Sequence, residues 1–208
     1  EGSLSDFRLQ WRNTFEKKTN EKEADWSDID AVINALEDSS PAGLEALAAA
    51  VDLDLFLSFW ALEVIVGHWD GYSGNRNNFF IYRSPDSPFV FLPWGADAVF
   101  SSNDSPFDSF KSPPSVSAHG AIAHRLYREE TTRQAYVLRL KEILDTVWKE
   151  EELIALTDQM AAIVQMHAMA KTRQAADKDA ERVRRFIRRR RVEILADLDP
   201  QPPAWPWP

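Results

Sequence analysis

Apolar residues recur at helical spacing along most of this 208-residue chain, and the pattern is interrupted by two short stretches of β-type sequence. These stretches read FFIYR and PFVFLP, and the SPDSP between them is rich in residues that form tight turns. The sequence therefore predicts a mainly α fold that contains one small β-hairpin. The chain is long enough for one domain with its own hydrophobic core.

Three helices are expected before the hairpin and four after it. The first begins at Ser27, which has the spacing of a capping box with Asp30. The second begins at Ser40, with Pro41 at the first helical position. The third covers about residues 54–67 and carries apolar side chains around most of its circumference, which predicts a buried helix. The later helices are expected over about residues 121–129, 133–148, 150–170 and 177–197.

The composition excludes several classes of protein. A formal net charge of −9 argues against a nucleic-acid-binding protein. The chain contains no cysteine and so has no disulfide and no thiolate metal site. The longest apolar run, 53–66, includes Asp54 and Glu63 and is too short to cross a bilayer, so we expect no integral membrane segment. We assign residues 1–198 to the domain and residues 199–208 to an extended tail rich in Pro and Trp.

The segment HWDGYSGNRNNFFIY places one Asp and three Asn in a short loop between the buried helix and the hairpin. The start of one hairpin strand lies beside the end of the other, so Asn78 and Asp97 are expected to face each other, with Asp70 nearby. Carboxylate and amide oxygens are ligands suited to Mg²⁺ or Mn²⁺. A second Asp close by can orient a hydroxyl group and accept its proton.

Protein kinases place a catalytic Asp, a metal-binding Asn, a hairpin and a metal-binding Asp in this same chain order. Asn75 has the kinase separation of five positions from Asp70, whereas Asn78 directly precedes the first strand. Both remain candidates for the metal-binding Asn. The alternative interpretation is ordinary turn chemistry, because Gly, Asn and Asp all tolerate the positive φ angles of a tight loop.

The segment HWDGYSGNRNNFFIY followed by FVFLPWGADAVF resembles the CotH kinase family, which is named for a bacterial spore-coat protein. The preceding helix VDLDLFLSFWALEVIVGHWD and the flanks EGSLSDF and FIRRRRVEIL extend the resemblance over most of the chain. The resemblance implies an atypical protein-kinase-like fold, of which residues 1–198 form the C-terminal lobe. It also implies a transferase that uses Mg²⁺ (or Mn²⁺) and ATP to phosphorylate Ser or Thr of exported or surface proteins. Asp70 would then be the catalytic Asp, and Asp97 with Asn78 or Asn75 would hold the metal and nucleotide.

Two features depart from the family pattern. The first Asp of the family's Pro-Trp-Asp-x-Asp motif is Gly95 here, which leaves Asp97. The residues before Ser27 do not read as a strand-rich N-terminal lobe with a phosphate-binding Lys, so we expect this chain to be the C-terminal lobe alone. Some fungal members are surface adhesins, and the alternative function is therefore a non-catalytic coat or surface protein, a pseudokinase or an adhesin. A location outside the cytoplasm follows from the resemblance.

Three other motifs have simpler interpretations. The stretch RVRRFIRRRR holds seven Arg, and we expect a helix whose apolar residues, including Leu195 further along, face inward while the Arg residues face outward. A phosphate or nucleic-acid patch is the alternative. The four His residues lack metal-ligand spacing, and His68 is expected to be half-buried at a helix end. The GYSG stretch falls short of a hydrolase nucleophile elbow and follows a helix.

Overall fold

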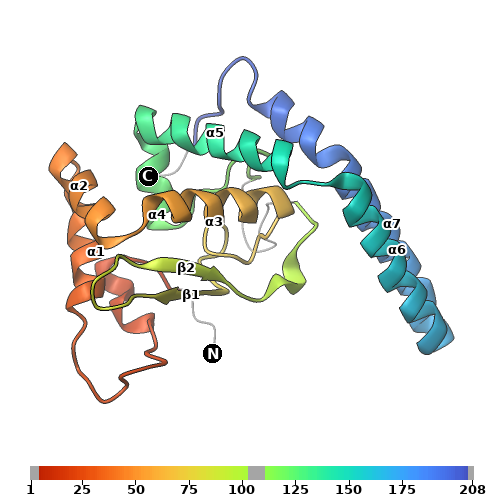
Figure 1. Ribbon diagram of the computed structural model, residues 1–208, viewed down its shortest axis with the longest axis horizontal. Helices are drawn as coiled ribbons and strands as arrows, with labels where there is room; N and C mark the ends of the chain where they lie inside the picture. Colours follow the sequence, from red (N-terminus) through yellow and green to blue (C-terminus); the bar gives the residue numbers. More distant parts are fainter. Residues whose placement is uncertain (1–4, 103–110, 206–208) are drawn as a thin grey trace.

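The computed structural model describes residues 5–102 and 111–205, and it is mainly helical with one two-stranded antiparallel sheet (Figure 1). The predicted fold class, mainly α with a small hairpin, is confirmed. Residues 103–110, part of the polar stretch SSNDSPFDSFKSPPSVSAHG that follows the hairpin, lie outside the described residues. The elements are η1 (Leu9–Thr14), α1 (Ser27–Glu37), α2 (Pro41–Ala50), α3 (Leu53–Val66), β1 (Phe79–Tyr82), β2 (Val90–Pro93), η2 (Ala96–Ala98), α4 (Ala121–Arg128), α5 (Glu130–Thr146), α6 (Glu150–His167) and α7 (Ala170–Asp197).

Helix α3 forms the centre of the hydrophobic core and packs against α5 and β2. Asp52 caps its first turn by accepting a hydrogen bond of 3.0 Å from the Leu55 amide. Gly67 ends the helix in the left-handed region at φ 63°, where glycine avoids the steric cost of a Cβ atom. Trp60 is fully buried and stacks on Tyr136 of α5 with 3.8 Å between ring centroids. The prediction of a buried third helix is therefore confirmed.

The two predicted helix starts have different outcomes. Helix α2 begins at Pro41 with Ser40 as the N-cap residue, as expected. The predicted capping box of α1 is wrong, because Ser27 makes no capping side-chain hydrogen bond. Asp30 pairs instead with Arg12, at 2.8 Å between Nη2 and Oδ2. A charged partner 18 residues away forms a stronger hydrogen bond with the carboxylate than a backbone amide would.

The hairpin pairs Phe79 with Pro93 and Tyr82 with Val90. Its inner face packs on the core through Phe79 and Phe91, whose rings stack with centroids 5.6 Å apart. On its outer face, large side chains are left at the surface, namely Phe80, Tyr82, Leu92 and Trp94. The hairpin therefore fixes the adjoining loop on one side and offers an aromatic surface on the other.

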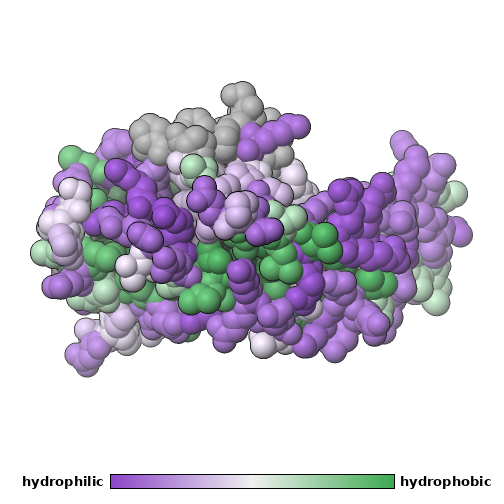
Figure 2. Space-filling model, turned by 90° about the horizontal axis from the view of Figure 1, so that it is seen from above, coloured by the Kyte–Doolittle hydropathy of each residue, from purple (hydrophilic) through white to green (hydrophobic). Residues whose placement is uncertain are grey.

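Helices α6 and α7 lie side by side and project from the body of the molecule (Figure 1). In the space-filling view the projecting part is mostly hydrophilic, with some hydrophobic residues along it (Figure 2). None of the helices in the described part of the chain combines the length and apolar character needed to span a membrane. The described part of the tail returns to the body, where the Tyr127 hydroxyl donates to the Pro203 carbonyl oxygen at 2.8 Å.

The arginines of α7 follow the prediction in part. Arg184 pairs with Asp158, and Arg191 pairs with Asp145, so these charges are balanced by acidic side chains of neighbouring helices. Arg190, however, is buried, and its Nε donates to the Ile65 carbonyl oxygen at 2.9 Å at the end of α3. Leu195, expected inside, is exposed. The expectation that all seven Arg face outward is therefore wrong at Arg190, because the last carbonyl groups of α3 need donors.

Candidate functional site

The candidate site lies in the loop His68–Asn78, between the end of α3 and the start of β1. Backbone hydrogen bonds inside the loop join the Gly71 amide to the His68 carbonyl (3.1 Å) and the Asn75 amide to the Trp69 carbonyl (2.9 Å). The loop is therefore compact and internally bonded, and it presents its side chains from a fixed backbone.

All three Asn side chains of the loop converge on the carboxylate of Asp70. Asn75 Nδ2 donates to Asp70 Oδ1 at 2.7 Å, and Asn78 Nδ2 donates to Asp70 Oδ2 at 2.6 Å. Asn77 Nδ2 lies 3.4 and 3.5 Å from the two carboxylate oxygens. The structure thus brings together Asp70, Asn75 and Asn78, which the sequence predicts for the site, and it adds Asn77. The convergence explains why so short a loop holds one Asp and three Asn.

The hairpin brings the end of β2 back to the loop, as predicted, although the residues found against Asn78 are Trp94 and Gly95, whereas Asp97 was expected there. The Trp94 amide donates to the Asn78 carbonyl oxygen at 3.0 Å, and the residue against the Asn78 side chain is Gly95. A Cβ atom added at Gly95 would lie 2.6 Å from both Cγ and Oδ1 of Asn78. Gly95 has φ 59° and Asn78 has φ 49°, so both ends of the hairpin adopt left-handed backbone. Asp97 follows in η2, with its side chain exposed.

His68 connects the two halves of this region. Its Nε2 atom lies 3.2 Å from the Gly95 carbonyl oxygen, and the residue is buried. Burial lowers the pKa of His68, while the Gly95 carbonyl and the charges of Asp70 and Asp97 act in the opposite direction. Both acidic candidates are therefore close enough to His68 to influence its charge. The expected half-buried helix-end histidine is in fact fully inside.

Glu63 supports the loop from within α3. Its two carboxylate oxygens accept hydrogen bonds of 2.8 Å from the Tyr72 and Ser73 amides, and its Oε1 lies 3.9 Å from His68 Nδ1. The side chain is buried, and burial raises the pKa of Glu63 to about 7, although the two amide donors oppose this shift. This role was not predicted from the sequence. A charged residue in an otherwise apolar buried helix was the available indication, because a buried charge needs partners.

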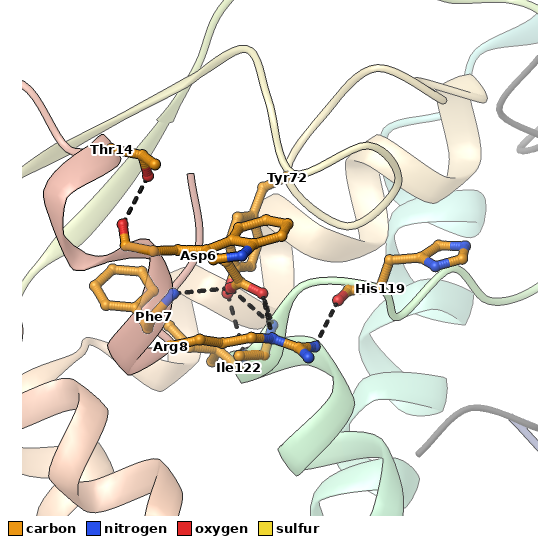
Figure 3. Close-up of polar contacts among 9 residues, drawn as sticks. Asp6, Phe7, Arg8, Thr14, Tyr72, His119 and Ile122 are labelled. Carbon is orange, nitrogen blue, oxygen red and sulfur yellow. Dashed lines mark hydrogen bonds and ion pairs between the residues drawn. The ribbon is translucent and has the colours of Figure 1, made fainter. Parts of the chain in front are cut away.

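Asp6 supports the same loop from the other side (Figure 3). It is fully buried and receives a hydrogen bond of 3.2 Å from the Tyr72 hydroxyl group. It also accepts from the amides of Phe7 and Ala121 and from Arg8 Nε. The Tyr72 hydroxyl in turn accepts from the Ile122 amide at 3.1 Å. Asp6 and Tyr72 therefore fasten the loop to the first turn of α4, a role that no sequence motif indicated.

The oxygen atoms around Asp70 are the ones in this loop that could hold a divalent cation together with a phosphate group. Among the described residues, no three His, Cys, Asp or Glu side chains form a metal-binding group. Magnesium commonly takes one or two carboxylates and completes its shell with phosphate and water oxygens. The Asn75 and Asn78 amide nitrogens face Asp70, so their Oδ1 atoms are the atoms left for such an ion.

A groove with a volume of about 940 Å³ adjoins the loop. It lies between residues 14–29 of the N-terminal segment and the hairpin, and Asn77 and Asn78 form part of its wall. Phe80 and Trp94 of the outer hairpin face also line it, with their rings edge to face at 5.3 Å. The candidate loop is therefore next to a space with an aromatic wall.

Comparison with known proteins identifies the family of this chain. The family model described as CotH kinase protein matches residues 3–194. Invasin CotH2 of Rhizopus delemar is 29% identical over 121 residues, which are 54% of this chain and 20% of that protein. The chain thus matches about a fifth of the length of this relative. Since the family model covers nearly the whole chain, this protein belongs to the CotH kinase family.

Proposed function

We propose that this chain is the C-terminal lobe of a CotH-type kinase, which transfers phosphate from ATP to Ser or Thr of an exported or surface protein. The observation that supports this most directly is the convergence of Asn75 and Asn78 on Asp70 at the base of the β1–β2 hairpin. This arrangement has the chain order of a kinase active site: catalytic Asp, Asn, hairpin and second Asp.

Asp70 is the proposed catalytic residue. Its carboxylate would orient the acceptor hydroxyl group and take its proton as the bond to phosphorus forms. The amides of Asn75 and Asn78 hold the carboxylate in one orientation before the substrate arrives. Such preorganisation is how phosphoryl-transfer enzymes obtain much of their rate enhancement.

Asp97 and the Oδ1 atom of Asn78 or Asn75 are the proposed ligands of Mg²⁺ or Mn²⁺. When bound, the ion would neutralise charge on the transferred phosphate. The exposed rings of Phe80 and Trp94 form an apolar surface beside Asn78, and we assign this surface to the base of the nucleotide. Apolar walls with a few polar groups are typical of cofactor sites.

A spore-coat or cell-surface location is supported by family membership and by the name of the fungal relative, an invasin. The second candidate function is a surface protein that binds a partner without catalysis. It is favoured by Gly95, which stands where the family motif has its first Asp. In this reading the Asp70 network would serve to stabilise the loop, since Asn and Asp also fit a tight turn.

Phosphate transfer by the full-length protein tests the proposal. With radiolabelled ATP, Mg²⁺ and casein as a general acceptor, Asp70→Asn should lower the single-turnover rate by about 10²–10⁴-fold, because the base is lost. ATP affinity should change less than about twofold, since Asp70 is assigned to the acceptor hydroxyl. Asp86→Asn is the matched control, because Asp86 is exposed in the hairpin turn. No detectable transfer by the wild type, or an equal rate in Asp70→Asn, would favour the non-catalytic function.

A further inference from the structure

A second groove, with a volume of about 330 Å³, lies away from the Asp70 loop. It runs between the segment before η1, the end of α1 and the outer face of α4. Four basic residues line it: Arg8, His124, Arg125 and Arg128. Leu9, which is 69% exposed, and the half-buried Leu36 also contribute to it. The groove therefore combines a cationic wall with an apolar one.

The basic side chains come from one face of a short amphipathic helix. The opposite face of α4 is buried in the core through Ile122 and Leu126. His124, Arg125 and Arg128 follow the spacing of three and four positions that places side chains on the same side of a helix. Core packing of the first face thus fixes the basic face toward the groove.

The positive charges of this groove are only partly balanced. Arg8 pairs with the buried Asp6, at 3.0 Å between Nε and Oδ2. Arg125 pairs with Glu129 and donates to the Ser39 carbonyl oxygen. Its side chain is only 11% exposed, yet its Nε has no hydrogen-bond partner among the residues that the structure describes. Arg128 makes no hydrogen bond or ion pair with any residue that the structure describes. Burial, and then the charges of Arg128 and Arg8, lower the pKa of His124, so these groups lie close together.

One acidic residue, Glu37, also lines the groove, and within the described part of the chain it makes no ion pair. The chain as a whole carries a net charge of −9, so a general attraction for anions is absent and any affinity for an anion must be local. Guanidinium groups bind carboxylate and phosphate groups through paired hydrogen bonds, which favours such ligands over other anions.

We propose that this groove binds an anionic side chain, phosphoserine or glutamate, of a peptide segment from a protein partner. Arg8 and Arg128 would hold the anionic group, and a neighbouring apolar side chain of the peptide would contact Leu9 and Leu36. The presence of both contacts selects a peptide over a free inorganic ion. This site is independent of the proposed phosphoryl transfer, because either a kinase or a non-catalytic surface protein needs a site for its partner.

The groove is joined to the candidate catalytic loop by two hydrogen bonds (Figure 3). Arg8 Nε donates to Asp6 Oδ2 at 3.0 Å, and the Tyr72 hydroxyl donates to Asp6 Oδ1 at 3.2 Å. Tyr72 is two residues from Asp70. A peptide in the groove would therefore lie against the framework that supports the loop.

Fluorescence anisotropy with this chain tests the proposal. The probes are three labelled eight-residue peptides that differ at one position, phosphoserine, glutamate or serine, next to a leucine. We expect the phosphoserine peptide to bind and the serine peptide not to bind. Binding of the glutamate peptide as well would assign the groove to acidic segments in general, whereas its failure would assign it to phosphorylated ones.

Two variants locate the site. Arg128→Gln should weaken binding of the phosphoserine peptide by roughly tenfold or more, the usual loss for one hydrogen bond to a charged group. Arg188→Gln, at an exposed position of α7, removes the same charge elsewhere and should change affinity less than about twofold. Equal effects of the two variants, or equal binding of the phosphoserine and serine peptides, would overturn the proposal. Arg128 is exposed, so its replacement should leave the fold intact.

Discussion

The side-chain amide of Asn78 donates both to Oδ2 of Asp70, at 2.6 Å, and to the carbonyl oxygen of Asp70, at 3.1 Å. The residue that opens the hairpin therefore fixes the position and orientation of the proposed catalytic carboxylate. Asn75 reaches the other carboxylate oxygen, at 2.7 Å, but makes no corresponding bond to the Asp70 backbone. The two candidate metal ligands are thus distinct in their structural roles.

This difference separates Asn75→Ala from Asn78→Ala. Asn78→Ala removes two hydrogen bonds and leaves alanine at φ 49°, so we expect a loss of about 2–4 kcal/mol in the free energy of unfolding. Asn75→Ala should cost about 1 kcal/mol. Urea denaturation measures both losses. Equal losses would mean that the bonds of Asn78 do not add stability.

Thermal melting with Mn²⁺ and ATP then identifies which Asn binds the metal. The variant whose Tm no longer rises with the metal has lost the metal-binding residue, and the other variant should still show the rise. We expect the loss in Asn78→Ala, because Asn78 directly adjoins the hairpin that leads to Asp97. An unchanged rise in both variants would exclude both residues as ligands.

Asp97→Ala should remove the stabilisation by Mn²⁺ with little effect on the fold. Asp97 is exposed, and it makes no hydrogen bond or ion pair with the residues that the structure describes, so its loss should change stability by less than about 0.5 kcal/mol. Thermal melting with and without Mn²⁺ checks this, with Asp86→Ala as the control for loss of one exposed carboxylate. A lower Tm without metal would instead give Asp97 a structural role.

Most of the fold was predictable because local patterns determine it. Seven helices and the hairpin follow from the spacing of apolar residues and from turn residues. The loop between α3 and the hairpin was predicted to be the functional site because of its Asp and Asn content. Helix ends were less predictable, since α7 begins at Ala170 and not near residue 177. The polar surface of that first part of α7 carries no apolar stripe that would indicate a helix.

The contacts that hold the loop and the end of α3 could not be predicted, because they join residues far apart in the sequence. Asp6 and Ala121 are 115 positions apart, and Arg190 and Ile65 are 125 positions apart. A carboxylate or guanidinium group has many possible partners in an unfolded chain. Only the packing of the whole domain decides which buried amide or carbonyl lies within its reach.

Glu63 should make the stability of the protein depend on pH. Its pKa is about 7 in the folded state and 4.5 is the ordinary value, so the folded state binds more protons than the unfolded state between these limits. The contribution of Glu63 is therefore greatest below pH 4.5 and declines as the pH rises through 7, by on the order of 3 kcal/mol. The lowered pKa of His68 acts in the opposite direction, so the wild-type profile mixes the two.

Comparison with Glu63→Gln isolates this effect, because Gln does not titrate while His68 is still present. Urea denaturation at pH 5 and pH 8 gives the free energy of unfolding of both proteins. The stability advantage of the wild type should be larger at pH 5 than at pH 8. The same advantage at both values would show that Glu63 keeps an ordinary pKa in the folded state.

The final prediction concerns the contact between Gly95 and Asn78. Gly95→Ala places a Cβ atom 2.6 Å from Cγ and Oδ1 of Asn78, at a φ of 59° that alanine disfavours. We expect a loss of about 2–3 kcal/mol, of which about 1–2 kcal/mol is backbone strain and the rest is displacement of Asn78. In Gly95→Ala/Asn78→Ala the clashing atoms are gone, so the second part should vanish. The double variant should therefore lose less stability than the sum of the single variants, by on the order of 1 kcal/mol. Additive losses would mean that Asn78 moves aside freely, and the close approach of the two residues would then not hold the Asp70 carboxylate in place.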